Sequence, residues 1–130
     1  MTIEKIIQVA NKLEAQLNER YSDYGLTVNQ ADLLIYFYQF GQNEISAQGA
    51  IDDLGIDKRL MSLAIKSLEK KDYIVRHTNA VDKRQKDIEL SIEALEMCED
   101  LILIKEEVNA IFEASLDFKQ VQLLNSLEME

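Results

Sequence analysis

The sequence predicts a mostly α-helical fold with one small β-hairpin. The 130 residues include no proline and only four glycines, so few residues would interrupt helices. Apolar residues recur three and four positions apart along most of the chain, which is the period of amphipathic helices. Only between residues 73 and 90 does the pattern change to the alternation expected of short strands.

Length and composition fit one globular domain spanning residues 1–130. The chain is 47% hydrophobic and 29% charged, which is ordinary for a protein with a packed core. Its single cysteine excludes an internal disulfide. No apolar run approaches the roughly 18 residues of a membrane span, and no leader sequence is apparent. We therefore expect a cytoplasmic protein without a membrane partner.

The first helix is predicted from Thr2 to about Tyr21, with one regular apolar stripe. The stripe consists of Ile3, Ile6, Ile7, Ala10, Leu13 and Leu17. Such a stripe at the end of a chain needs a cover. The stripe could pack against its own domain or against a partner subunit, and the sequence leaves both alternatives open.

A second helix follows a break at residues 22–25. Thr27 and Gln30 have the spacing of a capping box, and the helix runs to about Phe40. It is the most apolar helix of the chain, and we expect it to be the centre of the core. Its apolar residues are Leu33, Leu34, Phe37, Tyr38 and Phe40.

Two helices joined by a tight turn are predicted next. Ser46 is a candidate N-cap of the first, and Gly55 stands where its C-terminus favours a left-handed residue. Asp57 caps the second, which spans residues 57–71. Met61, Ala64, Ile65 and Leu68 form its buried stripe, and Arg59, Ser62, Leu63, Lys66 and Lys70 point the opposite way. This order is typical of a helix-turn-helix whose second helix enters the major groove of DNA.

Residues 74–90 are predicted to form a hairpin beside that helix. The segment from Tyr73 to Thr78 is rich in aromatic and β-branched residues, and alternation returns at residues 87–90. A hairpin in this place is a wing, which can lay an arginine along the DNA backbone or into the minor groove. We expect Asp82 to shape its tip or to orient Arg84 through a charge-assisted hydrogen bond.

Positive charge is concentrated in this part of the chain. Residues 58–86 carry nine Lys and Arg against three acidic residues, whereas the other 101 residues carry five against 21. The net charge of −10 disfavours a polyanion partner in general, but a local cationic surface favours double-stranded DNA. The candidate DNA contacts are Ser46, Lys58, Arg59, Ser62, Lys66, Lys70, Lys83, Arg84 and Lys86.

The C-terminal part is predicted to be helical from Ser91 to about Ala114. Its expected stripe is Ile92, Leu95, Cys98 or Glu99, Ile102, Val108 and Phe112. Asp117 and Gln120 would cap a last helix. Amphipathic helices at both ends suit a dimerisation region formed by residues 1–21 and 92–130. Its expected contacts are Ile3, Ile6, Ile7, Ala10, Leu13, Val108, Ile111, Phe112, Val121 and Leu124.

Catalytic and metal chemistry find little support. His77 is the only histidine, which argues against a histidine-based metal site or dyad within one subunit. Cys98 lies among apolar neighbours, where core or dimer packing is favoured over redox sensing. No glycine loop for phosphate and no nucleophile with a base is apparent. We expect a protein that is not an enzyme and holds no cofactor.

Three segments in this order resemble the MarR family of winged-helix transcription factors: LTVNQADLLIYFY, DLGIDKRLMSLAIKSLEKKDYIV and VDKRQKDIELS. The most specific likeness is the Asp-x-Arg wing signature at residues 82–84. The resemblance covers roughly residues 26–95 in detail and the flanking helices in outline, and it implies a DNA-binding core at residues 26–91. Leu60 and Leu63 stand where members commonly have Thr and Arg, and Asp72 replaces the usual Gly.

The resemblance implies a homodimeric repressor or activator, with repression preferred, often released by a small ligand or an oxidant. A two-fold dimer would recognise an inverted-repeat operator. The second reading is a winged-helix module that binds protein, which the overall acidity and Leu63 on the outward face favour.

Overall fold

The computed structural model describes residues 2–41, 44–84 and 86–128. Over these residues the chain forms six helices and one hairpin, as predicted. The elements are α1 (Ile3–Ser22), α2 (Val28–Phe40), α3 (Glu44–Leu54), α4 (Lys58–Lys70), β1 (Ile74–Thr78), β2 (Lys86–Leu90), α5 (Ile92–Ala114) and α6 (Phe118–Ser126).

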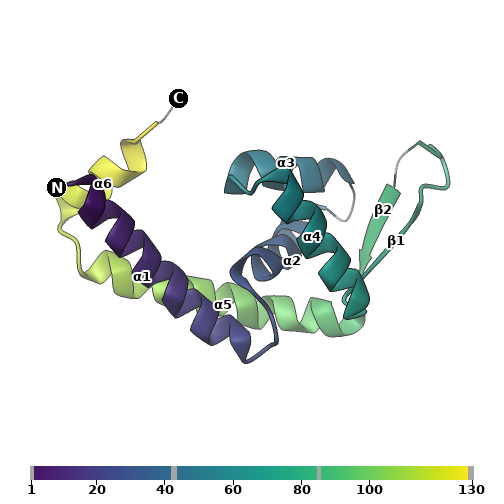
Figure 1. Ribbon diagram of the computed structural model, residues 1–130, viewed down its shortest axis with the longest axis horizontal. Coiled ribbons are helices and arrows are strands. Elements are labelled where there is room, and N and C mark those ends of the chain that lie inside the picture. Colours follow the sequence, from purple (N-terminus) through teal and green to yellow (C-terminus); the bar gives the residue numbers. More distant parts are fainter. Residues whose placement is uncertain (1, 42–43, 85, 129–130) are drawn as a thin grey trace.

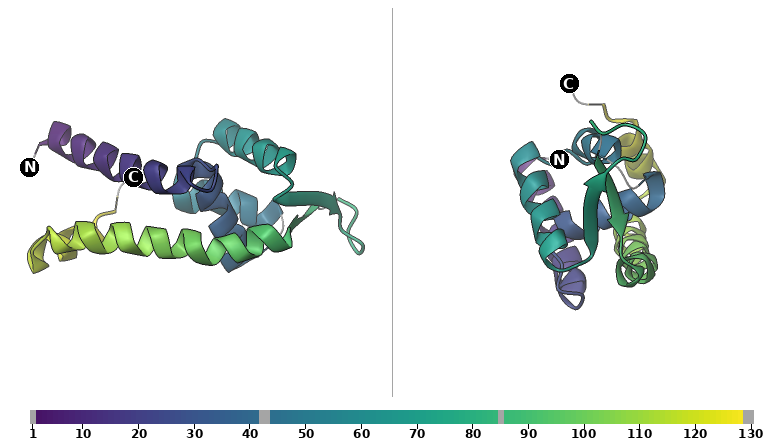
Figure 2. Two further views of the ribbon diagram at one scale, coloured as in Figure 1. Left: turned by 90° about the horizontal axis from the view of Figure 1, so that it is seen from below. Right: turned by 90° about the vertical axis from the view of Figure 1, so that its right-hand side faces the viewer.

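Helix α5 runs along the length of the molecule and joins its two parts (Figure 1). At one end α2 packs against α5 and carries α3, α4 and the hairpin, and at the other end α1 packs along α5. Figure 2 shows that α1 and α5 run side by side and that the hairpin projects from the end of the molecule opposite the N-terminus. The long helix therefore separates the hairpin from the chain termini.

Most helix boundaries follow the local signals read from the sequence. Thr27 and Gln30 form the capping box of α2, and Asp117 and Gln120 form that of α6. The Asp57 carboxylate caps α4 by accepting from the backbone N–H groups of its first turn. Gly25 and Gly55 follow α1 and α3 with φ of 70° and 67°, a region that favours glycine.

The predicted start of α3 is wrong. The helix begins at Glu44, so Ser46 lies inside it and is not its N-cap. A serine two residues into a helix resembles a cap in sequence, because nothing local shows whether the preceding backbone is already helical. The side chain of Ser46 lies outside the described residues, so its expected DNA contact stays a prediction.

Helix α2 is the centre of the core, as predicted. Tyr36 and Phe37 are among its buried residues, and Leu33 and Leu34 are fully enclosed. The expectation that Tyr38 and Phe40 also belong to the core is wrong, because they are 39% and 67% exposed and lie in the last turn of α2.

The apolar stripe expected on α5 is right at Cys98 and Val108 and out of phase at its other members. The buried residues of α5 are Ala94, Met97, Cys98, Leu101, Ile104 and Val108. Ile92 is exposed, whereas Leu95 and Ile102 flank the buried face. The run from Leu101 to Ile104 is continuously apolar, so periodicity alone permits two phases, and packing against α1 and α2 selects one.

Candidate nucleic-acid interface

Helix α4 buries one face and exposes the other. Met61, Ala64, Ile65 and Leu68 are buried, as the sequence predicts. The residues on its exposed surface are Lys58, Arg59, Leu60, Ser62, Leu63, Lys66 and Lys70. All the cations expected on this helix are therefore exposed to solvent, on the side opposite its buried stripe.

A polar network fixes α4 against α2. The Gln30 amide donates from Nε2 to Ser67 Oγ at 2.8 Å. Lys71 Nζ donates to the carbonyl of Gly25 and, at 3.2 Å, to Gln30 Oε1. Lys71 therefore serves the packing of the protein, although the charge pattern alone counts it with the cations of the surface.

The end of α4 adopts a backbone conformation that favours glycine. Asp72 has a φ of 62°, the only positive φ of a non-glycine residue in the described chain. Its N–H donates to Glu69 O at 3.0 Å, and the Tyr73 N–H donates to Leu68 O at 3.0 Å. These are the bonds of a Schellman motif, which turns the chain sharply from α4 into β1.

The hairpin pairs Ile74 with Leu90 at its base and Thr78 with Lys86 near its tip. The buried side chains Ile74 and Ile88 anchor its base to the core. The Arg76 guanidinium pairs with Glu69 of α4 at 2.8 Å, which links the wing to the helix. Arg76 is therefore the second cation of the cluster that acts within the protein.

Asn79 and Asp87 build the wing tip and were not singled out from the sequence. Asn79 Oδ1 accepts from the backbone N–H groups of Val81 and Asp82 at 2.8 and 2.9 Å. Its Nδ2 donates to both oxygens of Asp87, at 3.1 and 3.2 Å. An asparagine at the first position of a turn is a weak sequence signal for such an Asx turn.

Asp82 orients Arg84, as predicted. The carboxylate accepts from the Arg84 backbone N–H at 3.0 Å and from Nε at 3.2 Å. These bonds lower the pKa of the Asp82 carboxyl, because the guanidinium and the N–H stabilise its charged form. The Arg84 side chain is 92% exposed and projects from the tip.

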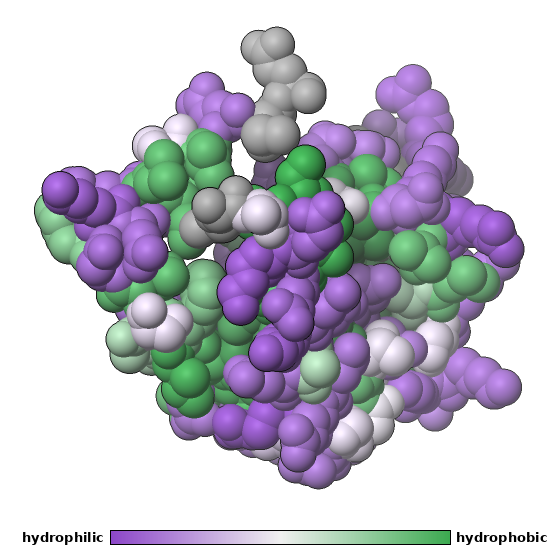
Figure 3. All heavy atoms as spheres, turned by 60° about the vertical axis from the view of Figure 1, so that its left-hand side comes forward, coloured by the Kyte–Doolittle hydropathy of each residue, from purple (hydrophilic) through white to green (hydrophobic). Residues whose placement is uncertain are grey.

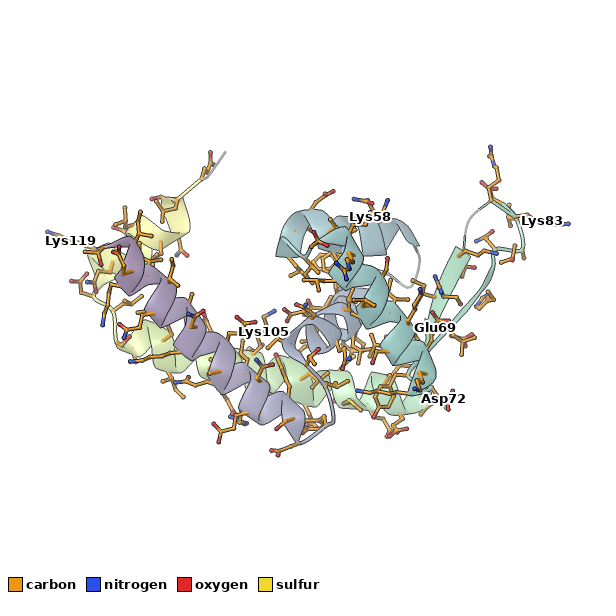
Figure 4. The ribbon with its side chains drawn as sticks, viewed as in Figure 1. Lys58, Glu69, Asp72, Lys83, Lys105 and Lys119 are labelled. Carbon is orange, nitrogen blue, oxygen red and sulfur yellow. The ribbon has the colours of Figure 1, made fainter. Side chains whose placement is uncertain are left out.

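Most of the remaining cations are free to meet a partner. Lys86 Nζ donates to Thr78 Oγ1 at 3.0 Å across the hairpin. Within the described residues no ion pair involves the side chains of Lys58, Arg59, Lys66, Lys70 or Lys83. Lys83 lies at the outer tip of the wing and Lys58 at the start of α4 (Figure 4). The hairpin tip faces away from the rest of its own chain (Figure 1).

Apolar side chains are exposed at the other end of the molecule (Figure 3). Of the expected dimer contacts, Ile3, Ile6, Ile7, Ala10, Ile111 and Leu124 are exposed, and Leu13, Phe112 and Val121 are half-buried. Val108 is different: it is 5% exposed and belongs to the interior of the single chain. Phe118 and Leu123 are exposed there too, and they are not among the expected dimer contacts.

Two of the open cavities along α5 share Lys105. One, of about 360 Å³, is lined by Ile35, Gln39, Ile102, Lys105, Glu106 and Asn109. The other, of about 160 Å³, is lined by Leu13, Leu17, Lys105, Val108, Asn109 and Phe112. Lys105 borders both and pairs with Asp32 of α2 at 2.9 Å. Both cavities have space for a small molecule or part of one.

Groups for other chemistry are sparse in the described part of the chain. It contains no cluster of three or more metal-ligating side chains, and none of its helices is long and apolar enough to cross a membrane. His77 lies on β1 with Nε2 3.5 Å from Glu89 Oε2. The Cys98 thiol is buried, donates to the carbonyl of Leu34 at 3.5 Å, and has its pKa raised to about 11 by desolvation. Such a thiol is unreactive at neutral pH.

The helix-turn-helix and its hairpin define a winged-helix fold, and solved structures share it over the whole chain. The DNA complex of MepR from S. aureus has a TM-score of 0.80 at 19% identity and covers 97% of this chain and 93% of that chain. A Listeria monocytogenes MarR-family regulator with a 26mer DNA has a TM-score of 0.77 at 22% identity, covering 96% and 82%. CouR from Rhodococcus jostii RHA1, bound to p-coumaroyl-CoA, has 0.77 at 16%, covering 96% and 92%.

The sequence itself points to the same class of proteins. Residues 24–85 match the sequence profile of the MarR family, and this segment contains α2, α3, α4 and most of the wing. No curated protein sequence matches the chain. Residues 24–85 thus resemble the MarR family in sequence, and the solved structures that share the fold include a MarR-family regulator.

Proposed function

We propose that the protein is a dimeric transcriptional regulator that binds double-stranded DNA through α4 and the wing. The observation that carries the proposal is the set of exposed cations on these two neighbouring elements, most of which make no ion pair with the described residues. Lys58, Lys66, Lys70, Lys83 and Lys86 are assigned to phosphates, and Arg59 and Ser62 to base edges. Arg84 enters the minor groove or lies along the backbone.

Dimerisation is assigned to the apolar end formed by residues 1–21 and 92–130. Ile3 and Phe118 are 72% and 74% exposed, and several further large apolar side chains surround them. Such a patch on a single chain marks an interaction site. A two-fold axis there would place two α4 helices in successive major grooves, so the operator is expected to be an inverted repeat. We assign residues 26–91 to DNA binding and the cytoplasm as the compartment.

Repression released by an effector is the mode of action we favour. One cavity lies between α2 and α5, and the other lies between α1 and α5. A small molecule bound there would act by favouring one separation of the two α4 helices over another. The proposal involves no catalytic step and no cofactor.

The central experiment is an anisotropy titration of a labelled random-sequence duplex at low salt. The wild-type protein should bind, and Lys83→Ala with Arg84→Ala should weaken binding and lower the salt slope by about two units. The matched control is Lys12→Ala with Lys119→Ala, which removes two exposed cations at the other end. Equal affinity of the two double variants would refute the wing assignment.

The same titration distinguishes the DNA-binding function from the alternative, a winged-helix module that binds protein. Leu60 and Leu63 on the exposed face of α4 favour that reading. An interaction module without a DNA partner should show negligible binding to the duplex even at low salt, where nonspecific electrostatic binding is strongest.

A further inference from the structure

We infer that Leu63, supported by Leu60, makes α4 read the methyl groups of thymines rather than the edges of guanines. The inference rests on the proposed DNA binding and specifies its target: an operator with thymines where α4 faces the bases. Leu63 is 54% exposed and Leu60 is 47% exposed, and both belong to the helix that carries the cations.

The position of Leu63 puts it at the centre of the exposed face. At about 100° per residue, it projects within about 40° of Arg59 and about 60° of Lys66. Leu60 lies one turn earlier, on the flank of the same face. Cations that hold a helix in the major groove would therefore bring the Leu63 side chain against the bases between them.

The groups that each base presents in the major groove determine which base an aliphatic side chain can contact favourably. Guanine presents two acceptors there, which an apolar group cannot satisfy, and burying them unpaired is unfavourable. Thymine is the base that presents a methyl group, which an aliphatic side chain can cover. The surrounding Arg59 and Lys66 favour a polyanion over an apolar protein surface as the partner.

The experiment begins with selection of bound sequences from a random-sequence duplex pool. The selected duplex is then synthesised with deoxyuridine in place of thymidine at one position at a time, which removes the methyl group and retains base pairing. At the positions facing α4 the wild-type protein should lose about fourfold in affinity, equivalent to about 0.8 kcal/mol for one methyl-sized group. Leu63→Ala should bind the two duplexes equally.

Ile92→Ala is the matched control, because Ile92 is an exposed aliphatic residue on α5 and should leave the methyl dependence unchanged. Circular dichroism would verify that Leu63→Ala folds, as an exposed position predicts. Wild-type binding that is indifferent to every uracil substitution, or selection of guanine at the facing positions, would overturn the inference while the proposed function stands. Absence of binding to the whole pool would overturn both.

Discussion

The guanidinium of Arg84 is held by the carboxylate of Asp82, with Nε 3.2 Å from Oδ1 and Nη2 3.4 Å from Oδ2. The carboxylate also binds the Arg84 backbone N–H, so one acid sets both the turn and the direction of the arginine. Because Arg84 remains exposed, the ion pair contributes little to folding stability. Its value lies in presenting the side chain to a partner.

Arg84→Ala is expected to weaken duplex binding about tenfold, the scale of one charge-assisted hydrogen bond. Asp82→Ala should weaken it about threefold, because Arg84 then has to be ordered on binding. The Asp82 carboxyl has a lowered pKa, so its ordering of the wing is present above the ordinary pKa of 3.8 and is lost as pH falls through the lower folded value. Anisotropy titrations of both variants test this order; a larger effect of Asp82→Ala would contradict it.

Lys70 and Lys71 are adjacent in the sequence, but substituting them should change different properties: DNA binding for Lys70 and folding stability for Lys71. Lys70→Ala should lower the salt slope of DNA binding by about one unit and leave unfolding unchanged, because Lys70 is exposed and makes no ion pair in the described chain. Lys71→Ala should lower the free energy of unfolding by about 1 kcal/mol through loss of its bonds to Gly25 and Gln30. Urea unfolding and salt titration of both variants measure the two quantities. If both variants had the same salt slope and the same free energy of unfolding, the bonds of Lys71 to Gly25 and Gln30 would not contribute to stability.

Ile6→Glu should convert the dimer into monomers, because it places a charge in the apolar end that we assign to the interface. Sedimentation equilibrium measures the change, and DNA affinity should fall with it, since two linked half-sites bind more tightly than one. Ile92→Glu introduces the same charge at an exposed aliphatic residue at the first position of α5, beside the wing and away from the apolar end, and should remain dimeric. If both variants behave alike, the interface lies elsewhere.

Asp72→Gly should stabilise the fold by about 1 kcal/mol, because glycine adopts the φ of 62° without steric cost. Asp72→Ala removes the same charge and keeps the strain, so it separates the backbone effect from electrostatics. We expect no gain for alanine, since its Cβ is unfavourable in this region. Urea denaturation of the three proteins gives the comparison, and equal stabilisation by both substitutions would indicate a charge effect.

Stability is expected to fall as pH rises from about 9 to about 12. Burial raises the pKa of the Cys98 thiol from 9.0 to about 11 and that of the Tyr21 hydroxyl from 10.0 to about 12. Both folded-state values are raised, so the stabilisation is complete below the unfolded values and is lost as the unfolded chain ionises first. Cys98→Ser should make the free energy of unfolding less dependent on pH in the lower half of this pH range. Tyr21→Phe should flatten the upper half at little cost near pH 7, because the buried hydroxyl has no hydrogen-bond partner among the described residues. Chemical denaturation across the range provides the test, and unchanged slopes would refute it.

Local chemistry accounts for the agreement between sequence and structure. The capping boxes at Thr27 and Asp117, the cap at Asp57 and the glycines after α1 and α3 each satisfy backbone groups within a few residues. Such interactions are fully specified by neighbouring residues. The Asp82 and Arg84 pair belongs to the same class, since two positions separate the partners.

Features that depend on residues far apart in the sequence could be determined only from the tertiary structure. Lys71 and Arg76 look like surface cations in the sequence, but Gly25, Gln30 and Glu69 bind them. Packing of α5 against α1 and α2 chose which side of an apolar run is buried and placed Val108 inside. The sequence by itself determined the helices, the turns and the stretch that holds the positive charge. The tertiary structure alone decided which of those charges remain free, because whether a long side chain pairs internally depends on what the fold brings within its reach.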